Sequence, residues 1–263
     1  MTTPTPAPGR RIRLTVAYDG TDFAGWQVQP GLSTIQGELE RALAAIEGAP
    51  VAVAGSGRTD AGVHALAQVA ACTIQNRIPE DNLRRAINRL LPRSIRVLEA
   101  REVHPAFHPR FDALAKTYEY RFWREEICPP LQRFAVYHYP YPLDEARMAA
   151  LAPLYEGEHD FTAFSAADQK DELGLSKVRR IFSARLAREG PELVFRVRGN
   201  GFLKHMVRML AGALIEAGKG NLDAEALHVR LKPGFPGKAG PAVPGRGLCL
   251  VSVEYPPTPP GAC

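Results

Sequence analysis

Hydrophobic and polar residues alternate along residues 11–18, near the start of the chain. A period of two is typical of a strand that is buried on one side. The turn pair Asp19-Gly20 follows directly and ends the strand. The buried face of this strand would consist of Ile12, Leu14, Val16 and Tyr18.

The rest of the first half alternates between helical and strand patterns. Ser33-x-x-Gln36 has the form of a capping box and predicts a helix start. Pro79 is suited to the first turn of a second helix. Apolar residues at helical spacing give the two stripes: Ile35, Leu39, Ala42, Leu43 and Ile46, then Leu83, Ile87, Leu90 and Leu91. Short strands are expected at 51–53, 66–74 and 95–103. The order is β-α-β-β-α-β, the split ferredoxin-like pattern.

The second half repeats that order without repeating the residues. Aromatic residues alternate with charged ones along 116–122, which predicts a strand. The elements expected after it are a helix over 143–155 with Asp144 near its cap, strands over 178–186 and 193–197, a helix over 202–217 ended by Gly218, a shorter helix over 222–231 and a last strand over 248–255. The duplication is therefore one of topology.

These patterns predict an α+β protein with two ferredoxin-like halves joined in a mostly antiparallel sheet, with a cleft between them. The first ten residues and residues 256–263 are rich in proline and would form tails, disordered at the amino end. The amino-terminal half would span 11–105 and carry the catalytic loop, and the carboxy-terminal half would span 106–255. The boundary is expected near residues 104–112.

Charge and cysteine content narrow the class of protein. Lys and Arg number 33 against 28 Asp and Glu, a net charge of +5, which permits nucleic-acid binding without requiring it. The cysteines are scattered, so a reduced, cytoplasmic protein is expected. No apolar run is long enough for a bilayer, and no secretory leader is recognisable. His104 and His108 are flanked by prolines and have no evident third ligand, so no metal is expected.

The most informative stretch is Gly55-Ser-Gly-Arg58-Thr-Asp60-Ala-Gly62-Val-His64. Its glycines allow sharp turns and a close approach to a partner. No Gly-Lys-Ser/Thr follows, which excludes a phosphate-binding Walker loop. Asp60 replaces the third glycine of a dinucleotide fingerprint and would repel pyrophosphate. Two readings remain: a tight turn with one surface ion pair, or an anionic nucleophile held ionised by Arg58 beside an anionic polymer.

Two further features each allow a structural and a functional reading. Tyr118 lies on an alternating strand, where an aromatic residue is a common part of the core. Lys204 and Arg208 would lie one turn apart on the helix over 202–217. They form either a solvated face or a cationic partner for phosphate or for Asp60.

Taken together, the motifs resemble those of the TruA-type tRNA pseudouridine synthases. The matching blocks, in order, are Tyr18-Asp-Gly with Phe23 and Gly25-Trp-Gln, Gly57-Arg-Thr-Asp-Ala-Gly-Val-His-Ala65, Phe107-His-x-Arg110, Lys116-x-Tyr-x-Tyr120, Gly157-x-His-Asp-Phe161, Gly201-Phe-Leu-x-His-Met-Val-Arg208 and Gly247-Leu-x-Leu250. They cover the chain except its two tails. Ser56 stands where many relatives have alanine, and Met209 where asparagine is frequent.

The resemblance implies isomerisation of uridine to pseudouridine in the anticodon stem-loop of tRNA, at positions 38–40. It implies that Asp60 is the nucleophile, that Arg58 pairs with it and assists base extrusion, and that Arg208 supports its carboxylate. Tyr118 would pack on the uracil and serve in deprotonating C5, and Leu248 would form an apolar wall. The remaining residues expected to bind substrate are His64, Lys204 and Arg110. Relatives of this type form homodimers in which each tRNA touches both subunits.

The chemistry of these residues agrees with that implication. Exchanging one bond to C1′ for another needs no redox cofactor and no metal; it needs an anionic group near an electron-poor carbon. An extruded base also favours an aromatic face and an inserted cation. Basic side chains that could meet phosphates, making binding salt-sensitive, are Arg84, Arg85, Arg89, Arg110 and Lys116.

Several alternatives stay open at this point. A pure RNA-binding module would need Asp60 only for structure. A carboxylate hydrolase would release free uracil and would need a second catalytic carboxylate near Asp60. Within the synthase reading, Asp60 attacks C1′, attacks C6, or acts through an eliminated glycal.

Overall fold

The structure is a computed structural model that describes residues 9–167 and 175–257. Most of the two expected tails lies outside these residues, but Arg10, assigned to the first tail, begins a strand. The described residues form a mixed α+β structure with mostly antiparallel strands, which confirms the expected class. Unit 1 comprises the described residues of Met1–Leu114 and Val253–Cys263, and unit 2 is Ala115–Ser252. The domain limits expected from the sequence stay a prediction.

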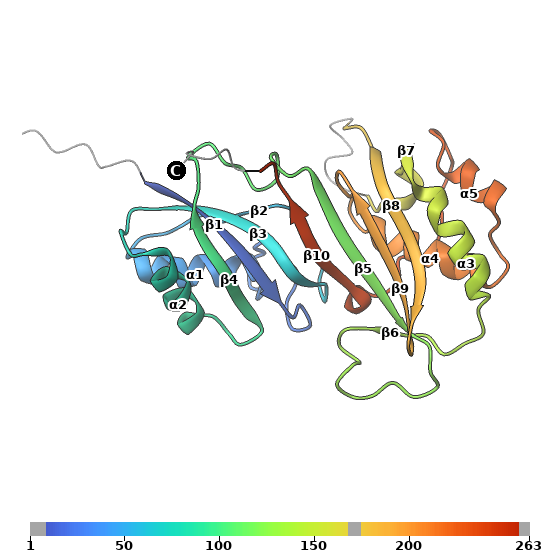
Figure 1. Cartoon of the computed structure of the whole chain (residues 1–263), viewed down its shortest axis with the longest axis horizontal. Coiled ribbons are helices and arrows are strands. Elements are labelled where there is room, and N and C mark those ends of the chain that lie inside the picture. The colour runs from blue at the N-terminus through green and yellow to red at the C-terminus, as the bar shows by residue number, and fades with distance from the viewer. Residues whose placement is uncertain (1–8, 168–174, 258–263) are drawn as a thin grey trace, which may run out of the picture. The chain divides into compact units, whose positions relative to one another are not determined.

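Unit 1 follows the predicted order of elements (Figure 1). Its strands pair in the order β4-β1-β3, with β2 also on β3, and every pairing is antiparallel. The elements are β1 (Arg10–Tyr18), α1 (Ile35–Glu47), β2 (Ala54–Gly55), β3 (His64–Ile74), α2 (Glu80–Leu90) and β4 (Ile95–Glu102). One face of β1 is buried, as the alternation predicts. Opposite Ile12, on β3, lies Cys72, which is fully buried.

Three local expectations in unit 1 are wrong. The cap of α1 is Thr34, whose hydroxyl accepts from Gly37 N at 3.2 Å, because the helix begins one residue later than a Ser33 cap requires. Leu90 is exposed because α2 ends there, and the next residue turns inward. Residues 51–53 form no strand: Val53 N donates to Glu40 and Val53 O accepts from Gln36, so α1 side chains take its backbone groups.

In unit 2 the strands are ordered β10-β5-β9-β8-β7. The pairs β5–β9, β9–β8 and β8–β7 are antiparallel, and β6 pairs parallel to β5. Tyr120 and Phe122 of β5 are fully buried. The elements are β5 (Ala115–Trp123), β6 (Tyr137–His138), α3 (Glu145–Leu151), β7 (Gly157–Asp160), β8 (Val178–Glu189), β9 (Glu192–Gly199), α4 (Met206–Gly218), α5 (Ala224–Arg230) and β10 (Leu248–Glu254). The last two residues of β10 belong to unit 1.

Two helices of unit 2 are shorter than predicted. The helix expected over 143–155 is α3, followed by a 3₁₀ turn over Ala152–Tyr155, because Pro153 has no N–H to continue an α-helix. The helix expected from residue 202 begins only at Met206. His205 has φ +60°, in the left-handed region, so the right-handed helix cannot continue through it toward residue 202.

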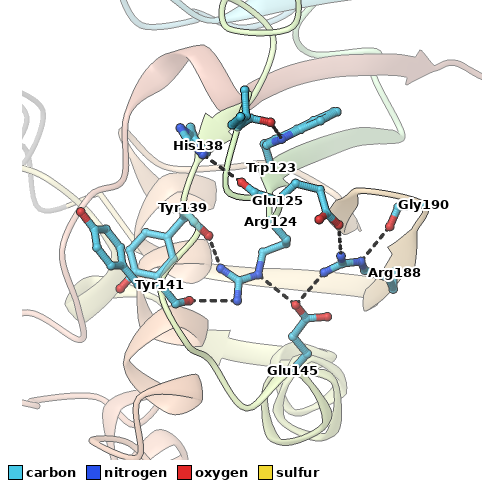
Figure 2. A network of polar contacts seen from close by, with 10 residues as sticks. Trp123, Arg124, Glu125, His138, Tyr139, Tyr141, Glu145, Arg188 and Gly190 are labelled. Atoms are coloured by element: carbon cyan, nitrogen blue, oxygen red, sulfur yellow. Dashed lines mark hydrogen bonds and ion pairs between the residues drawn. The ribbon is translucent and has the colours of Figure 1, made fainter. Parts of the chain in front are cut away.

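A network of charged groups holds the ends of β5 and β8 to α3 (Figure 2). Arg124 Nε and Arg188 Nη1 each lie 2.9 Å from the same oxygen of Glu145. Arg124 also donates to the carbonyls of Tyr139 and Tyr141, and its side chain is 7% exposed. Since a buried guanidinium is costly without an acceptor, Glu145 is the group on which this corner depends.

Replacing Glu145 with glutamine should lower the free energy of unfolding by about 1–2 kcal/mol, because two arginines then lose a charged acceptor. Urea denaturation measures the change. Glu99→Gln, which breaks the exposed Glu99–Arg101 pair, is the control and should change stability by less than about 0.5 kcal/mol. If Glu145→Gln lowered the free energy of unfolding no more than Glu99→Gln does, the network would add no more stability than an exposed ion pair.

Candidate functional site

The candidate catalytic loop in unit 1 joins β2 to β3 and contains Arg58 and Asp60. It closes in a turn in which Val63 N donates to Asp60 O at 3.2 Å, and Gly62 supplies φ +74°. Arg58 is exposed, whereas Asp60 is partly exposed. The loop therefore presents a cation and a carboxylate two residues apart, within reach of a bound molecule.

A buried polar network supports the loop from below. Gln68 on β3 is fully buried; it accepts from Ser56 Oγ at 2.6 Å and donates to Gly57 O at 3.0 Å. The hydroxyls of Tyr18 and Thr59 lie 2.9 Å apart, also buried. These bonds hold Gly57 and Thr59, so the backbone is fixed on each side of Arg58 and directly before Asp60. Gln68 is not among the residues predicted from the sequence, although an amide inside the apolar run 65–74 is a usable signal.

The segment 19–27 braces the loop from another side. Trp26 N donates to Thr59 O at 3.0 Å, and Trp26 itself is buried. A Cβ on Gly25 would lie 2.6 Å from Thr59 O and 3.0 Å from the carbonyl carbon of Asp60. Gly25 also has φ +97°. Only glycine permits this approach of the two backbones, which explains why the Gly25-Trp26 pair accompanies the catalytic loop.

His64 ends the loop and contacts the segment that follows β1. Its Nδ1 lies 3.2 Å from Gly20 N and 3.2 Å from Asp19 Oδ1, so it accepts from the first or, when protonated there, donates to the second. Partial burial opposes the charge of Asp19, but hydrogen bonds from Thr21 and the nearby His64 outweigh it and lower the pKa of Asp19. Asp19 therefore stays ionised at neutral pH and orients the imidazole.

In unit 2, Tyr118 lies on β5 and is 7% exposed. Its ring packs edge-to-face on Phe202, with centroids 5.0 Å apart. Two residues further along β5, the Tyr120 hydroxyl donates to Pro244 O at 2.7 Å. A Cβ on Gly247 would lie 2.7 Å from the Tyr120 ring, so this glycine lets the chain pass close to the ring into Leu248, which is buried at the start of β10.

Arg208 and Lys204 are held differently from the prediction. Arg208 lies in the first turn of α4, and its Nε donates to Val243 O at 2.7 Å. Lys204 precedes the helix and is exposed, with Nζ 3.3 Å from Ala167 O. The expectation that the two lie one turn apart on a helix is wrong, because His205 separates them with its left-handed backbone.

The predicted site residues divide between the two units. Arg58, Asp60 and His64 lie together on one loop of unit 1, and Arg110 lies on another loop of that unit. Tyr118, Lys204, Arg208 and Leu248 belong to unit 2. The catalytic and substrate-binding roles of these eight residues, and the pairing of Arg58 with Asp60, stay predictions. Lys116 is 8% exposed, a poor position for a phosphate contact.

The described residues contain neither a metal-binding cluster nor a membrane-spanning helix. Within 9–167 and 175–257, His, Cys, Asp and Glu side chains form no group of three able to hold a metal ion. His104 and His108 instead accept backbone N–H groups at Nδ1. None of the helices described is long and apolar enough to cross a bilayer.

Comparison with known proteins identifies the family. A family model described as tRNA pseudouridine synthase matches residues 14–112 and 151–256. This chain belongs to the tRNA pseudouridine synthase family. A protein of Solibacter usitatus named tRNA pseudouridine synthase A is 62% identical over 94% of this chain and 100% of its own length. Proteins of the same name from Geobacter sp. and Anoxybacillus flavithermus are each 45% identical, over 94% of this chain and 99% of theirs.

Membership confirms the resemblance inferred from the motifs, and it confirms that the chain is an enzyme of this class. The relatives align along almost their full length, so the match takes in both units. The family model likewise includes the catalytic loop, Arg208 and Leu248; its two matched stretches leave out 113–150, which contains Tyr118.

Substituting Gly25 with alanine should lower the rate of pseudouridine formation by about 10²-fold, because the new Cβ would displace Thr59 and the adjacent Asp60 by a few tenths of an ångström or more. The rate at saturating tRNA measures this. Gly31→Ala is the matched control: Gly31 also has positive φ, but a Cβ there meets nothing within 4 Å. Both variants should lose about 1 kcal/mol of stability from the positive φ, and Gly25→Ala should lose more because of the clash; under conditions in which both are folded, only Gly25→Ala should lose activity. Similar activity losses would contradict the role given to the close approach.

Proposed function

We propose that this enzyme converts uridine to pseudouridine in the anticodon stem-loop of tRNA, at positions 38–40, with Asp60 as the nucleophile. The observation that carries the proposal is the placement of Asp60: a partly exposed carboxylate on a loop that is bonded at Gly57 and Thr59, before it, and by Val63 N at its own carbonyl. Preorganised charge of this kind stabilises an electron-poor carbon without the cost of ordering the loop during the reaction.

The reaction is an internal exchange of bonds. The N1–C1′ glycosidic bond breaks with its electrons staying on N1, the uracil turns, C5 bonds to C1′, the proton on C5 leaves to solvent, and N1 takes up a proton. The carboxylate of Asp60 acts on the nucleotide by attack on C1′, by attack on C6, or through an eliminated glycal. All three routes need an ionised Asp60 and an extruded base, and none needs an oxidant or a metal.

The other roles follow from each side chain's own surroundings. Tyr118 packs on the uracil and takes the C5 proton; its ring is already set by Phe202. Leu248 is the apolar wall, and Arg208, anchored on Val243 O, supports the carboxylate. Arg58 is exposed and assists extrusion as an inserted cation. His64, Lys204 and Arg110 bind the RNA around the target.

The proposal extends to architecture and assembly. The strand orders β4-β1-β3 with β2, and β10-β5-β9-β8, support the reading of each unit as a ferredoxin-like half. We also propose that the enzyme works as a homodimer in the cytoplasm, where its tRNA substrate is found.

Supplying tRNA tritiated at uridine C5 tests the chemistry. The wild type should release the label into water, because the new C5–C1′ bond expels it, and Asp60→Asn should reduce release by at least about 10³-fold while still binding tRNA. Asp22→Asn removes an equal charge from an exposed position in the same unit and should keep full activity.

Each contrary outcome identifies a different error. Full tritium release by Asp60→Asn would end the nucleophile assignment. Free uracil among the products would indicate a hydrolase. If the wild type bound tRNA and released no label, the chain would act as an RNA-binding module.

A further inference from the structure

The loop over residues 107–112 in unit 1 carries a solvent-exposed aromatic side chain, Phe111. Phe111 is 75% exposed, the largest exposure of any aromatic side chain among the described core and surface hydrophobics. Beside it Arg110 is also exposed, with its guanidinium 5.7 Å from the Phe111 ring centroid. Single exposed apolar side chains are common on protein surfaces, so exposure alone gives Phe111 no role; its fixed position next to a cation is what points to one.

The loop is rigid where it displays Phe111. His108 Nδ1 accepts from Arg110 N at 3.1 Å and from Phe111 N at 3.3 Å, so one imidazole fixes both residues. Asp112 closes the turn: its carboxylate accepts from His108 N at 2.9 Å, and its N–H donates to His108 O at 3.1 Å. The His108 ring also lies 4.3 Å from the Phe111 ring at 34°, backing one side of it.

The loop is in turn fastened to the sheet of unit 1. Arg11 Nε donates to Phe107 O at 3.1 Å, and the Tyr255 hydroxyl donates to Pro109 O at 2.5 Å. The rings of Phe107 and Tyr255 pack 5.2 Å apart. Phe111 is thus an exposed ring on a fixed base, and little conformational entropy would be lost when a flat partner stacks on it.

We propose that Phe111 is a stacking platform for an unpaired base of the tRNA, with Arg110 contacting the adjoining phosphate. The proposal rests on the proposed function, since it names a further point of contact with the same substrate. An aromatic face offers stacking to any base, and a neighbouring arginine supplies the charge that a phosphate requires. Phe111 is a binding and positioning residue that lies outside the reacting atoms.

The test measures tRNA binding and turnover with the full chain. Phe111→Leu keeps the side chain apolar and removes the ring, so it should weaken the Kd for a tRNA transcript by roughly 5- to 100-fold. The kcat at saturating tRNA should stay within about twofold, and Phe111→Tyr should restore binding. Tyr141→Leu is the matched control, because Tyr141 is 65% exposed in unit 2 and should bind tRNA as the wild type does.

Salt dependence separates the two residues of the platform. Arg110→Gln should reduce the slope of log Kd against log salt by about one phosphate contact, whereas Phe111→Leu should leave that slope unchanged. An unchanged Kd for Phe111→Leu would overturn the proposal. So would a change in sedimentation coefficient with Phe111→Leu, since the ring would then serve a protein interface.

These outcomes are independent of the catalytic proposal. If Asp60→Asn still releases tritium, the nucleophile is wrong whatever Phe111 does. If Phe111→Leu binds normally while the wild type forms pseudouridine, only the platform is wrong.

Discussion

The hydrogen bond from Trp26 N to Thr59 O is the contact on which the candidate site depends. It joins two loops at a point where their backbones are too close for any side chain but hydrogen, at Gly25. From below, the buried amide of Gln68 holds Gly57 O. Arg58 lies between these anchors and Asp60 directly after them, both at least partly exposed on a backbone that has little freedom, and this combination of exposed charge and fixed main chain suits nucleophilic chemistry on a bulky polymer.

In unit 2, hydrogen bonds to backbone carbonyls also fix a segment that carries a predicted site residue. The carbonyls of Val243 and Pro244, in the segment before β10, accept from Arg208 and Tyr120. These two bonds fix the approach to Leu248, while Gly247 makes room for the Tyr120 ring. Side chains from β5 and α4 therefore set the position of a third element, and the predicted apolar wall depends on Tyr120, which has no proposed part in the chemistry, as well as on Arg208.

Periodicity predicted much of this fold, because the strand and helix patterns arise from burial on one side. The alternating face of β1 is buried as expected, and so are Ile35, Leu39, Ala42 and Leu43 of the α1 stripe; Ile46, near the end of the helix, is only half-buried. Errors arose where a backbone group found an unexpected partner or conformation. Val53 bonds to α1 side chains instead of a strand, and His205 adopts a left-handed backbone that no hydrophobic pattern encodes. The loop residues were recognisable by their motif, but the support that Gln68 gives them depends on a contact between positions eleven residues apart.

The buried thiol on β3 has a practical consequence. Burial raises the pKa of Cys72 to about 12, so at neutral pH about one molecule in 10⁵ carries the reactive thiolate there. Its neighbour across the strands is Ile12, the third pair from the Arg10 end of the β1–β3 pairing. Alkylation of this cysteine must await separation of the two strands. In a chain whose other cysteines are replaced, the labelling rate would report how often the sheet beneath the catalytic loop opens.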